Sequence, residues 1–157
     1  MSYNIFTDGA CRGNPGIGSW GFVVFDENKQ EQGFKTGVEI ATTNNAMELM
    51  AIKNALLHVC KNVDTYRREG GVTIHTDSAF CINVITQWMD GWEHNGWTKK
   101  SPGPIKNLDI IKEIHAHWHR AGHSVGNIQL AKVAGHSGNY GNDRVDQLCN
   151  KAIDAVQ

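Results

Sequence analysis

Two aspartates stand where apolar, strand-like segments end. Asp8 closes the first such segment in the sequence FTDG, and Asp77 closes another in HTDS. If the two strands are parallel neighbours, both carboxylates emerge at the same edge of the sheet, where open α/β sheets bind their ligands. The alternative is that each aspartate only starts a turn or caps a helix, which is common for this residue type.

A third carboxylate, Glu48, lies on the apolar side of a predicted helix. At about 100° per residue it falls outside the polar arc and shares a stripe with Ala51, Ile52, Ala55 and Val59. A buried carboxylate is strongly destabilising unless it is paired or bound to a metal ion. The alternative is a glutamate that complements the positive N-terminal end of its helix.

A fourth acid, Asp146, lies near the start of the last predicted helix, ten residues after His136 in a Gly-rich loop. Alone, each residue has an ordinary explanation. Asp146 can complement the helix dipole, and His136 can simply be an exposed side chain. Together, four converging carboxylates would form a hard-cation site that prefers Mg²⁺ or Mn²⁺ to zinc. Two such ions about 4 Å apart can activate water at a phosphodiester and stabilise the leaving oxygen, with His136 serving proton transfer or product exit.

The pattern of apolar residues indicates the elements that would bring these side chains together. Three closely spaced strands come first, and helices and two further strands follow, which predicts a mixed α/β sheet with helices on its faces. The expected strands are 3–7, 19–25, 33–38, 72–76 and 128–133; the expected helices are 47–59, 78–88 with a further helical segment after it, 108–119 and 143–156; the expected turn and loops are 11–16, 62–71 and 120–127.

The chain of 157 residues, 40% of them hydrophobic, fits a single domain over residues 1–157. Its start resembles no signal peptide and it has no long apolar run, so we expect a soluble cytoplasmic protein, monomeric by default. The four widely spaced cysteines favour free thiols. A net charge of −1 argues neither for nor against a nucleic-acid partner.

Taken in order, the motifs resemble those of bacterial ribonuclease H type 1. The resemblance covers nearly the whole chain and includes FTDG with GNPG, TTNN with MEL, TDS, GHSG, and Asn142 with Asp146. It implies the ribonuclease H-like fold: a five-stranded mixed sheet, three antiparallel strands then two parallel, with helices on both faces. It also implies an endoribonuclease that cuts the RNA strand of RNA–DNA hybrids and leaves 5′-phosphate and 3′-hydroxyl ends.

The same resemblance implies roles for individual residues. Asp8, Glu48, Asp77 and Asp146 would be the metal ligands, for two Mg²⁺ ions when substrate is bound, with Mn²⁺ as a substitute. His136 would act from a catalytic loop. Minor-groove contacts would come from Cys11, Asn14, Asn44 and Asn45, and a DNA phosphate would bind Thr43 and Asn107. For the asparagines, helix capping is an equally good interpretation, and both roles are compatible.

The segment from Gln87 to Lys100 resembles the DNA-gripping protrusion of the family. Trp88 and Trp92 would share a helical face and stack on the substrate, although tryptophans at this spacing also occur in cores. The segment is less basic than its counterparts because it contains Asp90 and Glu93. This difference predicts weaker hybrid affinity and a steeper dependence on salt.

Three histidines, His115, His117 and His119, form a second cluster. His115 and His119 have the i, i+4 spacing of a helical zinc pair, but no H-E-x-x-H motif or nearby cysteine completes the site. An exposed, partly basic helix face is therefore the expected interpretation. Two rival functions remain open from sequence: a catalytically silent hybrid-binding module, which the complete set of acids disfavours, and a DNA-cleaving enzyme of the same fold.

Overall fold

The computed structural model describes residues 2–133 and 139–157. These residues form a five-stranded sheet in the spatial order β3-β2-β1-β4-β5. The first three strands pair antiparallel, and β1-β4 and β4-β5 pair parallel, which confirms the predicted fold class. The strands are β1 (Tyr3–Arg12), β2 (Gly16–Phe25), β3 (Glu31–Thr42), β4 (Val72–Thr76) and β5 (Ile128–Lys132).

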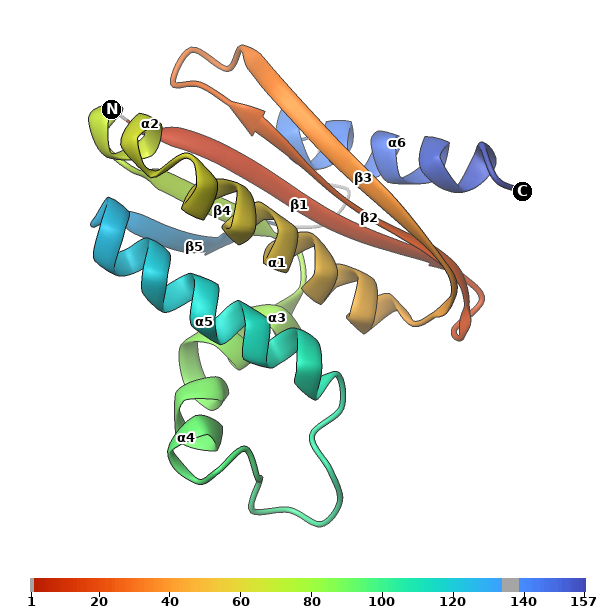
Figure 1. Ribbon diagram of the computed structural model, residues 1–157. Helices are drawn as coiled ribbons and strands as arrows, with labels where there is room; N and C mark the ends of the chain where they lie inside the picture. The colour runs from red at the N-terminus through yellow and green to blue at the C-terminus, as the bar shows by residue number, and fades with distance from the viewer. Residues whose placement is uncertain (1, 134–138) are drawn as a thin grey trace.

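Helices cover both faces of the sheet (Figure 1). The helices α1 and α5 lie over one face and α6 lies over the other, while α3 and α4 extend below the sheet edge in this view. The helical elements are α1 (Asn44–Lys61), α2 (Val63–Arg68), α3 (Ala79–Asn83), the π-helical η1 (Val84–Trp88), α4 (Met89–His94), α5 (Leu108–Val125) and α6 (Tyr140–Asp154).

Side chains of the central strands alternate between two buried clusters. Ile5 of β1 joins the larger cluster beneath α1 and α5, whereas its neighbour Phe6 joins the smaller one beneath α6. Phe22 and Val23 of β2 divide in the same way. Successive strand residues point to opposite faces, so β1 and β2 are held from both sides and their ends are fixed in position.

The helix α1 begins where the TTNN motif offers capping side chains. Thr43 has an extended backbone, and its hydroxyl accepts a hydrogen bond from the Ala46 N–H at 3.2 Å. The stripe predicted for this helix, Glu48 with Ala51, Ile52, Ala55 and Val59, is buried. The cap and the apolar stripe together fix the rotation that turns Glu48 toward the sheet.

Three segments expected as a turn or a loop contain regular structure. The strand β1 continues through Cys11 and Arg12, where a turn was expected, because both residues keep their pairing with β2. The expected loop 62–71 contains α2, which is anchored by the buried Tyr66. The expected loop 120–127 is largely the last part of α5, whose apolar stripe continues through Ala121 and Val125. In the sequence, charged and glycine residues surround Tyr66, Ala121 and Val125, and their burial is therefore not evident from the local pattern.

Candidate active site

The matching positions of Asp8 and Asp77 follow from the register of two strands. On the parallel strands β1 and β4, Phe6 is paired with His75, and each aspartate lies two residues further along its strand direction. Asp8 is still within β1 and is only 5% exposed. Asp77 follows the last residue of β4, and the next residue, Ser78, caps α3. The sequence inference that both carboxylates share one sheet edge is confirmed.

Glu48 reaches this edge from α1, where that helix crosses β1. Gly9 allows the crossing, because a Cβ at Gly9 would overlap the backbone nitrogen of Glu48. Glu48 is 6% exposed. Sequence inspection identified Glu48 from its helical stripe but missed the role of Gly9, for which the only signal was a glycine directly after the strand-terminal aspartate.

The three side chains Asp8, Glu48 and Asp77 form one group. One carboxylate oxygen from each residue lies within 4.8 Å of the other two. Oxygen atoms from a strand, a helix and a strand-to-helix turn thus converge, although the residues are far apart in sequence. Such a set of carboxylates suits a hard divalent cation.

Burial and mutual repulsion change the acidity of the group. Desolvation by burial, followed by the charges of Asp77 and Asp146, raises the pKa of Asp8 to about 8. Burial, followed by the charge of Asp8, raises the pKa of Glu48 to about 10, while a hydrogen bond from the Gly9 backbone acts in the opposite direction. Without a counter-charge, these two carboxyls therefore hold protons at neutral pH.

An unpaired buried oxygen supports a cation at this place. Oε1 of Glu48 is buried and has no hydrogen-bond partner within residues 2–133 and 139–157. A buried acceptor without a partner is destabilising, and a bound cation would satisfy it. The donor set, three carboxylates, matches the same class of ion. The residues present therefore fit a divalent metal.

The two remaining predicted catalytic residues are Asp146 and His136. Asp146 lies in α6 and is close enough for its charge to raise the pKa of Asp8, but it does not belong to the three-residue group. His136 lies outside the described residues.

The predicted minor-groove residues gather where β1, β2 and α1 meet. The Oδ1 of Asn14 accepts the Asn44 N–H at 3.0 Å, which ties the turn before β2 to the start of α1. The Cys11 thiol donates to the Gly13 carbonyl at 2.8 Å. Asn44 and Asn45 are exposed, so the structure leaves their side chains accessible. Thr43 provides the N-cap of α1, and this capping role is compatible with substrate contact.

Asn107 and Trp88 lie at the ends of the segment that leaves the sheet. Asn107 precedes α5 with a left-handed backbone, φ 60°, and its side chain makes no capping hydrogen bond. Trp88 is 38% exposed and its ring lies 5.9 Å from that of Trp92. The two tryptophans line an open groove of about 740 Å³, whose other lining residues include Phe80, Lys99, Lys100 and Lys106.

The sheet order and the placement of helices define the ribonuclease H-like class of α/β folds. LC11-RNase H1, isolated from compost, superposes with a TM-score of 0.73 at 24% identity, covering 99% of this chain and 97% of that chain. The structure of LC11-RNase H1 in complex with an RNA/DNA hybrid gives a TM-score of 0.69 at 25% identity, covering 98% of each chain.

Sequence comparison identifies the family. The RNase H family profile matches residues 1–154. The ribonuclease H of Acidovorax sp. (strain JS42) is 39% identical over 152 residues, covering 97% of this chain and 95% of the relative. That of Alcanivorax borkumensis is 41% identical over 153 residues, covering 98% and 92%. This chain belongs to the RNase H family, which confirms the resemblance in its motifs and places it among the nucleases.

Proposed function

We propose that this chain cuts the RNA strand of RNA–DNA hybrids internally, by attack of water on the phosphodiester, and leaves 5′-phosphate and 3′-hydroxyl ends. The observation that carries the proposal is the convergence of Asp8, Glu48 and Asp77. It agrees with the family assignment, and LC11-RNase H1 has been seen with an RNA/DNA hybrid. The complete carboxylate set argues against a catalytically silent binding module.

The cofactor is proposed to be Mg²⁺, for which Mn²⁺ can substitute. Asp8, Glu48 and Asp77 would hold it together with Asp146, as two ions when the hybrid is bound. When bound, the ions supply activated water and stabilise the charge that develops on the leaving oxygen. The proximity of positive charge also keeps Asp8 and Glu48 ionised, in opposition to the effects that raise their pKa.

The protein side chains supply position and proton transfer. The backbones of β1 and β4 fix Asp8 and Asp77, and packing of α1 on Gly9 fixes Glu48. As a metal ligand, the Glu48 carboxylate would also accept a hydrogen bond from the attacking water. His136 is proposed, on its sequence position alone, to transfer a proton at the leaving 3′-oxygen.

Hybrid recognition is proposed at two places on the surface. Cys11, Asn14, Asn44 and Asn45 would contact the minor groove, where 2′-hydroxyls distinguish RNA from DNA. Thr43 and Asn107 would hold a DNA phosphate, because backbone contacts position a duplex without reading its sequence. Trp88 and the lysines of the 740 Å³ groove would grip the DNA strand further along.

The setting of the protein is a proposal of the same kind. The cysteines Cys11, Cys60, Cys81 and Cys149 are free thiols, as expected, which suits the reducing cytoplasm. Among the described residues, no helix is long and apolar enough to cross a membrane. We propose a monomer as the working form, which sedimentation velocity would check.

A cleavage assay tests the proposed function. Labelled RNA–DNA hybrid, duplex DNA and duplex RNA are incubated with Mg²⁺, Mn²⁺ or chelator, using the unmodified chain, Asp77→Asn, and Asp64→Asn as a matched control on the exposed side of α2. We expect metal-dependent cutting of the hybrid alone, loss with Asp77→Asn, and full activity with Asp64→Asn. Cutting in chelator would exclude the mechanism, and equal cutting of duplex DNA would exclude the substrate assignment.

A further inference from the structure

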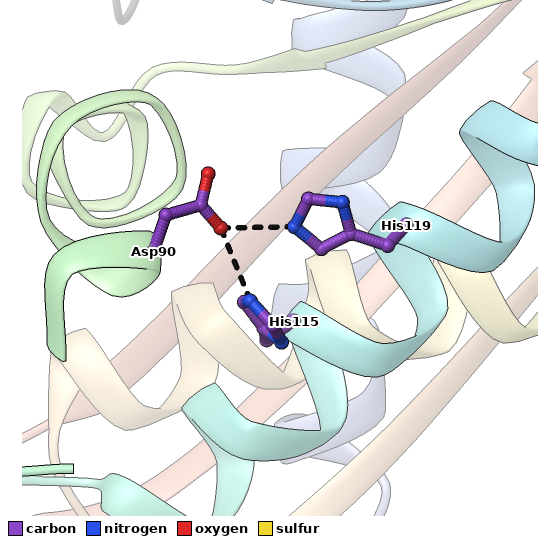
Figure 2. A group of neighbouring side chains, drawn as sticks. All are labelled: Asp90, His115 and His119. Carbon is purple, nitrogen blue, oxygen red and sulfur yellow. Dashed lines mark hydrogen bonds and ion pairs between the residues drawn. The ribbon is translucent and has the colours of Figure 1, made fainter. Parts of the chain in front are cut away.

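A second group of metal-ligating side chains lies between α4 and α5. Asp90 from α4 faces His115 and His119 from α5 (Figure 2). The Oδ1 of Asp90 lies 3.1 Å from Nε2 of His115 and 2.9 Å from Nε2 of His119. One ligand atom from each of the three residues lies within 4.8 Å of the other two.

The fold holds this group in place from both helices. His115 and His119 are four residues apart, so they lie on one face of α5, one turn from each other. The neighbouring face of α5 is fixed by Ile111 and Ile114, which are fully buried in the larger cluster. On α4, the residue before Asp90 is the fully buried Met89, which anchors that helix at the same point.

The surroundings leave the group both ordered and accessible. The ring of Trp97 packs edge-on against His115 at 5.3 Å, and the His115 side chain is only 20% exposed. The side chains of Asp90 and His119 are 67% and 52% exposed, so an ion can reach the group from solvent. The sequence predicts only an exposed helix face here, because no third ligand stands near the histidines along the chain; the structure supplies that ligand in Asp90.

We propose that Asp90, His115 and His119 bind a divalent transition metal of the zinc class and thereby cross-link α4 to α5. Two ligand atoms of a tetrahedral zinc ion, each bound at roughly 2.0–2.1 Å, lie about 3.3 Å apart. The observed separations of 2.9 and 3.1 Å between the histidine nitrogens and the shared oxygen require only a small outward shift. Each histidine would bind the metal as a neutral imidazole, through an unprotonated Nε2 and with its proton on Nδ1, and water would complete the coordination.

This site differs from the carboxylate group in its donor atoms and therefore in the metal ion that it prefers. Imidazole nitrogen suits Zn²⁺, Ni²⁺ and Cu²⁺, whereas Mg²⁺ prefers oxygen ligands. A two-histidine, one-carboxylate site should therefore take micromolar zinc in the presence of the Mg²⁺ that the active site would use. Zinc binding here does not rest on the proposed function, because it requires only the contact between α4 and α5.

A metal bound between α4 and α5 would affect the groove next to it. Trp88 directly precedes α4 and Trp92 lies within it, and both line the groove of about 740 Å³. A metal at Asp90 would fix α4 against α5 and replace a local negative charge with a net positive one. If the groove grips DNA as proposed above, zinc would strengthen hybrid binding and offset the low basicity of this segment.

Zinc binding is measured best in the whole chain with two of the active-site carboxylates removed, so that the active-site group no longer competes for the ion. In the Glu48→Gln/Asp77→Asn background, isothermal titration with Zn²⁺ should give one bound ion per chain, and Co²⁺ should give visible absorption bands of nitrogen-ligated metal. Adding His119→Gln should weaken zinc binding roughly tenfold or more, in line with the loss of a ligand. The exposed His123 of the same helix provides the control, since His123→Gln should leave zinc affinity unchanged.

Three results would contradict the proposed zinc site. Absence of zinc binding in the Glu48→Gln/Asp77→Asn background would show that Asp90, His115 and His119 form only a hydrogen-bonded contact. Equal affinity with and without His119→Gln, or an equal loss with His123→Gln, would place the ion elsewhere. Thermal melts in chelator show whether each variant is folded, and Asp90→Asn provides a second ligand variant at an exposed position.

Discussion

The backbone of Glu48 lies against Gly9 with no room for a Cβ between them. This close approach brings α1 close enough to β1 for the Glu48 carboxylate to join Asp8 and Asp77. A helix held further away would leave Glu48 outside the group. The position of one glycine in β1 therefore determines whether the third carboxylate can share a cation.

Gly9→Ala should damage both folding and activity. The added Cβ would overlap backbone atoms of α1, which no rotamer change can relieve, so we expect a loss of about 1–3 kcal/mol in the free energy of unfolding. Displacement of Glu48 should also lower kcat. Gly33→Ala is the control, because a Cβ at Gly33 meets nothing within 4 Å. Urea melts and hybrid cleavage measure both effects, and normal stability and kcat in the Gly9→Ala protein would contradict this role.

Asp77→Asn should stabilise the metal-free protein while it abolishes cleavage. The charge of Asp77 raises the pKa of both Asp8 and Glu48, so its removal relieves repulsion wherever a neighbouring carboxyl is ionised, as Asp8 is above its raised pKa of about 8. At about pH 9 we expect the free energy of unfolding in chelator to rise by about 0.5–2 kcal/mol, as for other sites that trade stability for activity. Asp64→Asn should change neither property. A destabilised Asp77→Asn protein would show that the aspartate serves mainly a structural purpose.

The stability of the metal-free protein should decrease as pH rises. Burial and neighbouring acids raise the pKa of Asp8 to about 8 and that of Glu48 to about 10 in the folded state. In the unfolded chain both carboxyls titrate at roughly 4. Because the folded protein holds these protons more tightly, their stabilising contribution is complete below the unfolded pKa values and is lost as pH rises toward the folded ones.

The free energy of unfolding in chelator should therefore fall as the pH rises from about 4 to about 8. Urea melts in chelator across this range measure it. Mg²⁺ should make the decrease smaller, because it stabilises the ionised carboxylates. An Asp8→Asn/Glu48→Gln protein should show a flatter profile. The same pH dependence in both proteins would mean that other groups are responsible.

Trp88→Ala should weaken hybrid binding more than it slows the chemical step. The indole is 38% exposed at the groove and lies away from the carboxylates, so its loss should cost about 1–3 kcal/mol of binding free energy. KM should rise and kcat should change little. Phe34→Ala, at another exposed aromatic residue, is the control and should leave KM unchanged. A fall in kcat at constant KM would contradict a role limited to binding.

How much the sequence could predict depended on whether the signal was local. Asp8 and Asp77 could be paired because each ends an apolar strand, and Glu48 could be identified from its helical stripe. The helix α2 and the last turns of α5 were missed, because their buried anchors, such as Tyr66 and Ala121, stand among charged and small residues. The contact of Asp90 with His115 depends on how two helices pack after a long loop, which no local pattern encodes.

The most direct test of the shared carboxylate site is a calorimetric titration of Mg²⁺ into the unmodified chain, Asp8→Asn and Glu48→Gln. We expect binding to the unmodified chain and at least a roughly tenfold loss of affinity in each variant, because each removes a ligand oxygen. His119→Gln should bind Mg²⁺ normally, since nitrogen donors do not select this ion. Undiminished Mg²⁺ affinity in both carboxylate variants would contradict a common cation site.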